Sequence, residues 1–390
     1  MDHVLSEVRR RPALQQPDWG EGASVQRVRK QLASRPALVR AEDVRTLRSL
    51  LAEVAAGEAH LVQAGDCAED PTENTVGYVA RKAAVLDLLA GAMKMITHKP
   101  VVRVGRIAGQ FGKPRSKAFE RIGGTDLPAF RGHMVNSPEP EPGGRQPDPR
   151  RLLDGYQTAS DIFTHLGWGG PARRPVIDPL VWTSHEALLL DYELPMLRRD
   201  ETGTPILTSA HLPWIGERTR QLDGAHVALL SRVANPVACK VGPGITVPEV
   251  LGLCERLDPR REGGRLILIA RMGADAVADR LPPLVEAVRA EGHPVVWLCD
   301  PMHGNTVVTA EGFKTRYLET IEREIQDFQT AVRSQDGIAG GLHLETTPDD
   351  VTECVRNESC ADEVGRKYTS FCDPRLNPSQ AVFAVSAWRG

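Results

Sequence analysis

His303 has the sequence context of a residue that does chemistry. It lies in segment 300–306, which reads Asp-Pro-Met-His-Gly-Asn-Thr and directly follows the apolar run 294–299. A β-branched apolar run that stops at Asp-Pro predicts a buried strand followed by a polar loop. We therefore expect His303 at the carboxyl end of a strand, where α/β proteins keep their functional groups.

Other side chains that bind metals also follow apolar runs. Cys67 comes after run 59–65, Glu345 comes after run 341–344, and Asp373 lies in a late loop. Thiolate, imidazole and carboxylate are ordinary ligands of divalent transition metals. Because these ligands are mixed and far apart in the sequence, they favour a catalytic metal with an open coordination position over a structural zinc site. We predict that Cys67, His303, Glu345 and Asp373 form this site.

Basic residues make up a second class of strand-end side chain. Arg106, Lys240 and Arg271 end apolar runs, and Arg218 follows in the turn 214–218. Desolvated cations need anionic partners, and we expect nearby carboxylates to account for too few of them. Guanidinium groups bind carboxylate and phosphate in bidentate fashion, so the cluster predicts a small anionic substrate. The alternative interpretation is that these cations form structural salt bridges.

Segment 113–116 is a second candidate for anion binding. It places Lys113, Pro114, Arg115 and Ser116 together after a turn that contains two glycines. A point charge, a fixed φ, a bidentate fork and a hydroxyl suit a phosphate group; the alternative is a solvated basic loop. Two anion sites beside one metal predict two phosphorylated substrates.

The elements that must position these residues alternate between short apolar runs and helix-like stretches. The predicted strands lie at 59–65, 100–108, 180–184, 205–210, 237–241, 265–270, 294–299 and 341–344. Helical spacing covers stretches such as 79–95, 281–291 and 313–332. This count predicts an α/β protein with a (β/α)8 TIM barrel. A doubly wound open sheet is the alternative, but its first strand would usually end in a glycine-rich phosphate turn, where this chain has Asp66 and Cys67.

Composition limits the class of protein. The chain has 390 residues, is 41% hydrophobic and carries a formal net charge of −3, so we expect no general attraction to nucleic acid or anionic lipid. The absence of a long apolar run or signal peptide predicts a cytoplasmic location. Seven scattered cysteines without CxxC pairs argue against a disulfide framework.

Domain organisation follows from the same pattern. We predict a helical N-terminal extension at 1–57 and a catalytic barrel at 58–390. The region 131–150 is rich in proline and glycine, and we expect it to be an exposed loop rather than a linker.

Several motifs together resemble one enzyme family. The motifs are QAGDCAE at 63–69, RIAGQ at 106–110, KPRS at 113–116, WIGERTRQLDGAH at 214–226, DPMHGNT at 300–306 and CDPRLN at 372–377. The chain from about residue 19 to the C-terminus resembles class II (plant-like) 3-deoxy-D-arabino-heptulosonate 7-phosphate (DAHP) synthase. This resemblance implies a metal-dependent condensation of phosphoenolpyruvate with erythrose 4-phosphate and water, which gives DAHP and phosphate in the first step of the shikimate route.

The resemblance also implies roles for individual residues. The metal ligands would be Cys67, His303, Glu345 and Asp373, with manganese or cobalt as the metal. Phosphoenolpyruvate would be held by Arg106, Trp214, Glu217, Arg218, Lys240 and Arg271. Erythrose 4-phosphate would be held by Lys113, Pro114, Arg115 and Ser116. Cys67, Lys240 and His303 are the candidate catalytic residues. Either a lysine or a metal-bound water would shuttle protons.

Two features depart from the family's feedback-regulated members. The chain is shorter between Ile162 and Val181, where those members carry a helical hairpin that helps to form an effector site. We therefore expect little feedback inhibition by aromatic amino acids, as in shortened forms that serve phenazine or antibiotic pathways. Cys372 is the second feature: it stands beside Asp373, and we hypothesise that it forms an oxidisable pair with Cys67; the alternative is a buried free thiol.

Three alternatives to this reading differ in activity. AminoDAHP synthase is so similar that the same residues would serve an iminated erythrose phosphate. A catalytically inactive barrel that serves as a regulatory partner, for example of chorismate mutase, would not need the residues that bind the metal and the anions. A generic metal hydrolase would not explain two anion sites. We expect a homodimer.

Overall fold

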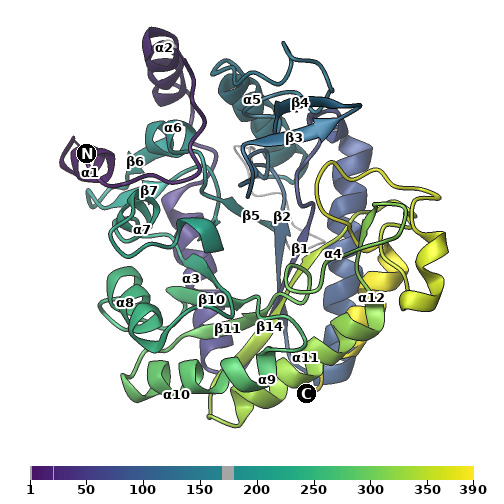
Figure 1. Ribbon diagram of the computed structural model, residues 1–390. Helices are drawn as coiled ribbons and strands as arrows, with labels where there is room; N and C mark the ends of the chain where they lie inside the picture. Colours follow the sequence, from purple (N-terminus) through teal and green to yellow (C-terminus); the bar gives the residue numbers. More distant parts are fainter. Residues whose placement is uncertain (1, 21, 169–179) are drawn as a thin grey trace.

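A closed barrel of eight parallel strands forms the centre of the computed structural model, which describes residues 2–20, 22–168 and 180–390 (Figure 1). In order around the barrel, the strands are β1 (His60–Gly65), β2 (Val101–Arg106), β5 (Trp182–Glu186), β8 (Leu212–Ile215), β9 (Val237–Val241), β10 (Leu266–Ala270), β11 (Val296–Cys299) and β14 (Ile338–Glu345). Pairing of β1 with both β2 and β14 closes the barrel. The predicted TIM barrel is confirmed, and an open sheet is excluded.

Helices follow the strands and cover the outside of the barrel, as Figure 1 shows. They are α4 (Val76–Thr97), α5 (Arg151–His165), α6 (Leu190–Glu193), α7 (Ala225–Leu230), α8 (Val247–Leu257), α9 (Val277–Arg280), α10 (Pro282–Ala290), α11 (Leu318–Arg333) and α12 (Pro378–Ser386). Short 3-10 turns are η1 (Pro71–Glu73), η2 (Leu194–Met196), η3 (Glu217–Thr219) and η4 (Glu358–Glu363). Within the described residues, none of these helices has the combined length and apolar character needed to cross a bilayer.

Three helices precede the first barrel strand: α1 (Asp2–Arg9), α2 (Gly22–Ala33) and α3 (Ala41–Ala55). The buried residues of α3 are Val44, Leu47, Leu51 and Val54, spaced three and four apart as an amphipathic helix requires. This face packs against β1 and β14. Helix α1 packs on α7, and α2 packs on α5 and α6. The N-terminal segment is helical as predicted, and it lies directly on the barrel.

One of the eight predicted barrel strands is wrong. Segment 205–210 contains β7 (Pro205–Leu207), which forms an antiparallel hairpin with β6 (Leu197–Arg199) outside the barrel. The fourth barrel strand is β8, which pairs with β5 and β9. Pro213 inside β8 explains the error, because a proline within an apolar run argues against a central strand.

Two hairpins and one long loop extend the carboxyl end of the barrel. The hairpins are β3 (Phe119–Ile122) with β4 (Thr125–Pro128), and β12 (Val307–Val308) with β13 (Lys314–Thr315). Loop 131–150 is not the exposed excursion that its composition predicts. Met134, Val135 and Asn136 are buried, and the Asn136 amide donates to the carbonyls of Ala129 and Arg145. The exposed residues of the loop are its proline-rich tip at 139–143 together with Gln146 and Arg150.

Candidate active site

The carboxyl ends of the barrel strands open into a cavity of about 800 Å³. Its basic lining residues are Arg106, Lys113, Arg115, Lys117, Arg121, Arg218, Lys240, Arg271, Lys314 and Arg316. Its acidic lining residues are Glu120, Asp126, Glu186, Glu217 and Asp373. The cavity is therefore basic although the whole chain has a net charge of −3, and it suits small molecules that carry several negative charges.

Three of the four predicted metal ligands meet at this cavity. One ligand atom each from His303, Glu345 and Asp373 lies within 4.8 Å of the other two. His303 Nε2 is 3.1 Å from Glu345 Oε1. Glu345 ends β14, His303 follows β11, and Asp373 lies in the last loop before α12, so the barrel brings together residues that are distant in the sequence.

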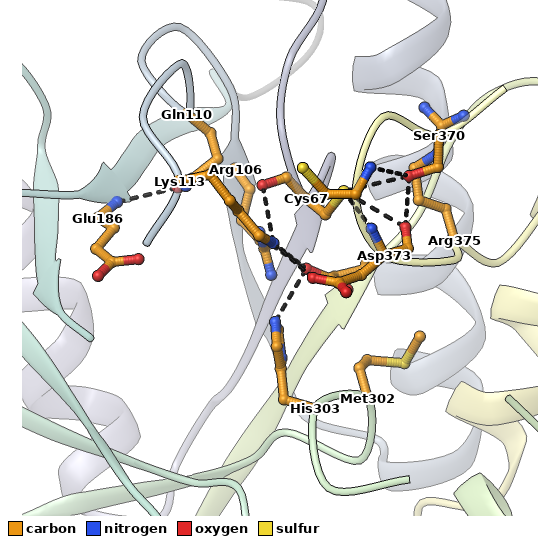
Figure 2. Close-up of polar contacts among 12 residues, drawn as sticks. Cys67, Arg106, Gln110, Lys113, Glu186, Met302, His303, Ser370, Asp373 and Arg375 are labelled. Atoms are coloured by element: carbon orange, nitrogen blue, oxygen red, sulfur yellow. Dashed lines mark hydrogen bonds and ion pairs between the residues drawn. The ribbon is translucent and has the colours of Figure 1, made fainter. Parts of the chain in front are cut away.

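Cys67 lies beside this group. Its Sγ atom is 3.5 Å from the backbone nitrogen of Asp373, but it is not within 4.8 Å of all three other ligand atoms (Figure 2). A hydrogen bond from Cys372, with a further contribution from the charge of Lys113, lowers the pKa of the Cys67 thiol to about 6. A thiol with this pKa is largely thiolate at neutral pH, and thiolate is the form that binds metals.

Asp300 orients the imidazole of His303. Its Oδ2 atom accepts from His303 Nδ1 at 2.8 Å, and its Oδ1 atom accepts from the backbone N–H of Met302 at 3.1 Å. Because an ionised carboxylate only accepts, Nδ1 carries a proton and Nε2 is turned toward Glu345. Lys240 donates to Asp300 at 2.9 Å. Burial acts to raise the pKa of Asp300, but the charges of His303 and Lys240 outweigh it and hold this pKa well below its ordinary value.

Glu345 is surrounded by cations. Arg106 and Arg316 lie 3.0 and 2.8 Å from its carboxylate oxygens, and Lys113 Nζ lies 3.8 Å away. Although burial opposes ionisation, these charges and that of His303 hold the pKa of Glu345 well below its ordinary value. The expectation that strand-end cations lack carboxylate partners is therefore wrong for Arg106, as it is for Lys240 with Asp300. Both remain part of the cavity wall.

Hydrogen bonds inside the barrel hold the Arg106 side chain in place. They run through Gln63, Ser184 and His343, which we call the interior chain. Arg106 lies 2.9 Å from His343 Nε2, and Gln63 Oε1 lies 2.7 Å from His343 Nδ1. Gln63 donates to Ser184 Oγ, which donates to the carbonyl of Gly105. Because Arg106 only donates, Nε2 of His343 accepts, and every donor direction along the chain is determined.

Arg218 and Arg271 match the prediction of cations open to a ligand. Within the described residues, no carboxylate lies within salt-bridge distance of either guanidinium, and both line the cavity. Arg271 donates to the carbonyl of His303 at 3.0 Å. Arg218 donates to Ser116 Oγ at 2.6 Å, which brings the two predicted anion sites into contact.

Segment 113–116 lies on the cavity wall, but both of its charged side chains are paired. Lys113 Nζ is 2.8 Å from Asp373, and Arg115 is 2.8 Å from Glu120. Pro114 and Ser116 line the cavity beside them. The interpretation as a solvated basic loop does not hold for Lys113, which is buried.

Trp214 and Glu217 also line the cavity. Trp214 is buried, and the guanidinium of Arg106 lies 5.4 Å from its ring centroid in a cation–π contact. Glu217 accepts from Arg220 at 3.0 Å. Its carboxylate also approaches Gly242, where an added Cβ would lie 3.1 Å from both Glu217 and Arg271. The predicted residues of the larger anion site thus share one wall.

Comparison with known proteins assigns the chain to a family. Residues 3–168 and 172–386 match the model of the class-II DAHP synthetase family. The chain belongs to the class-II DAHP synthetase family.

Relatives in the class-II DAHP synthetase family align along almost the whole chain. A Pseudomonas fluorescens protein named "probable phospho-2-dehydro-3-deoxyheptonate aldolase" is 58% identical over 390 residues, which cover 100% of this chain and 98% of the relative. A Streptomyces coelicolor protein named phospho-2-dehydro-3-deoxyheptonate aldolase is 40% identical over 421 residues, with 95% of this chain and 93% of the relative covered. Since 421 positions exceed the 390 residues of this chain, the Streptomyces relative carries residues that this chain lacks.

A solved structure supports the fold alone. The phospho-2-dehydro-3-deoxyheptonate aldolase of Francisella tularensis superposes with a TM-score of 0.54 at 14% identity, covering 94% of this chain and 97% of that chain.

The residues present fit the metal on which class-II DAHP synthetases depend. His303 donates from Nδ1 to Asp300, so the nitrogen left to bind a metal ion is Nε2, which lies 3.1 Å from a carboxylate oxygen of Glu345. Without a proton on it, Nε2 would be a second acceptor beside that oxygen. A divalent cation satisfies two such acceptors at once, and one nitrogen with two carboxylates is an ordinary ligand set for it.

Sequence reasoning missed several residues of this site. His343 stands two positions before Glu345 in β14 and therefore shares its face, a signal that strand periodicity offered. Arg316, which pairs with Glu345, and Lys314, which pairs with Asp373 at 2.9 Å, come from the hairpin region after β11. That segment has no apolar run that would have predicted a strand end.

Proposed function

We propose that this chain is a DAHP synthase that condenses phosphoenolpyruvate with erythrose 4-phosphate and water, releasing phosphate, in the first step of the shikimate route. The observation that carries the proposal is a basic cavity whose wall also holds His303 and Asp373, two members of the three-residue ligand group. Membership in the class-II DAHP synthetase family supports the same reaction. Both substrates are phosphorylated, in keeping with the charge of the cavity.

Phosphoenolpyruvate is assigned to the wall formed by Arg106, Trp214, Glu217, Arg218, Lys240 and Arg271. Arg218 and Arg271 have no carboxylate partner within the described structure, so they are available for bidentate binding of phosphate or carboxylate. Arg106 is held by His343 and Glu345, which gives it a fixed direction. Such positioning of an enol phosphate lowers the entropy cost of bringing C3 to its acceptor.

Erythrose 4-phosphate is assigned to Lys113, Pro114, Arg115 and Ser116. The contact of Ser116 with Arg218 places this segment next to the proposed phosphoenolpyruvate wall. The two reacting carbons would then meet between the walls, close to the ligand group.

The metal site is assigned to His303, Glu345, Asp373 and Cys67, with Mn²⁺ or Co²⁺ as the ion. A bound divalent metal would supply Lewis-acid polarisation of the aldehyde oxygen. Lys240 and His303, both in contact with Asp300, are candidates to hold or move protons at the reacting atoms.

The experiment is a turnover assay with and without each component. Phosphate release from phosphoenolpyruvate should require erythrose 4-phosphate, should stop with EDTA, and should return with Mn²⁺ or Co²⁺. His303→Ala should lose both metal and turnover. Phosphate release without erythrose 4-phosphate would contradict the proposal, and faster turnover with an iminated acceptor would identify an aminoDAHP synthase.

A further inference from the structure

The chain between α1 and α2 lies against loops at the carboxyl end of the barrel. We call residues 12–19 of this connection the N-terminal strap; it belongs to the purple segment that joins α1 and α2 in Figure 1. Gln16 donates to the carbonyl of Leu188, in the loop after β5, at 2.8 Å. The Trp19 ring nitrogen donates to the carboxylate of Asp191 in α6 at 2.6 Å. The strap is therefore fixed relative to these loops, although it lies outside the barrel.

Gln15 is the residue through which the strap reaches segment 113–116. Its side-chain Oε1 accepts from the backbone N–H of Arg115 at 2.9 Å. Its backbone carbonyl accepts from the guanidinium of Arg131 at 3.4 Å. The carbonyl of Arg131 in turn accepts from the backbone N–H of Lys113 at 2.8 Å. Gln15 thus holds the segment directly at Arg115 and, through Arg131, at Lys113.

The backbone of Gln15 has an unusual conformation. Its φ angle is 63°, in the left-handed region that residues with a side chain rarely adopt. Such a conformation persists where surrounding contacts over-determine it, and it is found more often at functional sites than elsewhere. Here it accompanies contacts from both the amide and the carbonyl of this one half-buried residue.

The charges around Gln15 explain why a neutral side chain suits this position. Burial, together with the charge of Arg115, lowers the pKa of Arg131 below its ordinary value. Arg115 pairs with Glu120 at 2.8 Å, whereas no carboxylate of residues 2–20, 22–168 or 180–390 lies within salt-bridge distance of Arg131. An acid in place of Gln15 would compete with a phosphate for these cations. An amide holds the segment and leaves its positive charge in place.

We propose that Gln15 is a positioning residue for erythrose 4-phosphate: its side-chain amide holds the backbone of Arg115 so that segment 113–116 keeps the shape that fits the phosphate. This inference rests on the proposed function, which assigns that segment to erythrose 4-phosphate. A part of the chain outside the barrel thereby completes the site for one of the two substrates.

The proposed phosphoenolpyruvate wall is held by other means. Arg106 pairs with Glu345 at 3.0 Å, and Lys240 pairs with Asp300 at 2.9 Å. Both carboxylates belong to the barrel or to the loop that follows β11. Loss of the Gln15 amide should therefore weaken the binding of erythrose 4-phosphate and spare that of phosphoenolpyruvate.

The test shortens the side chain in the full-length protein. Gln15→Asn keeps an amide and tolerates a left-handed φ, but it is one methylene too short to reach Arg115. We expect KM for erythrose 4-phosphate to rise about three- to tenfold, as the loss of one hydrogen bond predicts. KM for phosphoenolpyruvate and kcat should stay within about twofold. Gln15→Gly, which adopts this φ freely, should give the same result; a role confined to the turn backbone would leave both variants like the wild type.

Hydrogen exchange tests the contact itself. The peptide that contains Arg115 should exchange faster in Gln15→Asn than in the wild type, because its backbone N–H loses its acceptor. Gln16→Ala is the matched control, since Gln16 is a glutamine of the same strap that contacts the loop after β5 instead. It should leave both KM values and the exchange of this peptide unchanged.

Wild-type turnover is measured first, because its absence would refute the proposed function, whereas hydrogen exchange tests the contact of Gln15 without turnover. With an active wild type, an unchanged KM for erythrose 4-phosphate in Gln15→Asn would overturn the inference. So would an equal rise in KM for both substrates, because that result would show a general disturbance of the cavity. An equal effect in Gln16→Ala would assign the change to the seating of the whole strap and would likewise overturn the role of the Gln15 amide.

Discussion

A single hydrogen bond fixes which ring nitrogen carries the proton in His303, and another does so in His211. Asp300 accepts from Nδ1 of His303, so that nitrogen keeps its proton. At His211 the direction is reversed, because the backbone N–H of Thr183 donates to Nδ1 at 3.1 Å. His211 is fully buried, and its ring packs 4.3 Å from that of Trp168 between centroids. Burial lowers the pKa of His211 to about 3, so the folded chain holds it neutral.

Stability should therefore fall in acid partly through His211. An unfolded histidine binds a proton below its ordinary pKa of about 6.5, whereas the folded His211 does not until about pH 3. Within this window the unfolded state binds more protons, so the free energy of unfolding decreases as pH falls. Replacing His211 by Gln should reduce that slope by up to about 1.4 kcal/mol per pH unit, measured by urea unfolding at several pH values. Equal slopes for both proteins would contradict the assignment.

Cys67 and Cys372 are buried in one small apolar cluster with Ala68 and Phe130. Because their side chains share a hydrogen bond, we predict that mild oxidation joins them in a disulfide and removes Cys67 from the proposed ligand set. Mass spectrometry of oxidised protein, with metal content measured in parallel, is the check. Cys372→Ser should keep its metal under the same oxidant; finding no Cys67–Cys372 linkage in the wild type would disprove the pairing.

Much of the site was predictable at this scale because its residues follow apolar runs. His303, Glu345 and Arg106 all stand where a strand ends, and the structure brings them together. Which charged side chains pair with one another could not be predicted in the same way. Nothing in the order of residues indicates that Lys113 meets Asp373, some 260 positions later, since that contact depends on closure of the barrel and the path of the last loop.

Two loops that carry site residues touch each other at glycines. A Cβ added to Gly304 would lie 2.4 Å from the backbone nitrogen of Gly273. Glu324 of α11 accepts from that same nitrogen at 2.8 Å, and Arg271 donates to the carbonyl of His303. The loops after β10 and β11 are thereby held as one unit that sets the direction of the His303 ring.

Gly304→Ala should separate these loops and displace His303. We expect a loss of metal affinity and kcat of about tenfold or more, because ligand geometry tolerates little displacement. Metal titration and turnover are the measurements. Gly91→Ala is the control, since Gly91 in α4 has open space around its Cα and alanine should stabilise the helix by roughly 0.5–1 kcal/mol. Unchanged metal affinity in Gly304→Ala would show that the close approach is not needed.

At the level of elements, period and length predicted seven barrel strands and the helices around them. The sequence pattern misses β8 because Pro213 interrupts its apolar run, and it favours 205–210 because that segment begins with Pro205, Ile206 and Leu207. The strands of the small hairpins, β3 with β4 and β12 with β13, are too short to show the alternating pattern by which strands are predicted. The division into 1–57 and 58–390 stays a prediction, and the packing of α3 on β1 and β14 argues for treating the two parts together in any truncation.

Charge is distributed unevenly over the molecule: the chain has a formal net charge of −3, while basic residues outnumber acidic ones in the lining of the cavity of about 800 Å³. Composition could only exclude a general basic surface. The concentration of cations at one end depends on the barrel, which points every strand end to the same face.

Regulation is also a property of the whole chain. The shortened region between Ile162 and Val181 falls largely on residues 169–179, which lie outside the described residues. Relatives that align over more than 400 positions carry segments absent here. We therefore predict that phenylalanine, tyrosine and tryptophan, alone or combined, leave turnover within about twofold of the uninhibited rate. A turnover assay with each amino acid is the check, and strong inhibition by any of them would contradict it.

The interior chain has a consequence for how this barrel can change over evolutionary time. Because each donor from Arg106 through His343 and Gln63 to Ser184 has one determined acceptor, replacing any one member leaves a buried polar group unpaired. Replacing neighbours together can restore the pairing. Sequence drift in the heart of the barrel should thus proceed by coordinated exchanges, and a library that varies these positions jointly should yield more folded variants than one that varies them singly.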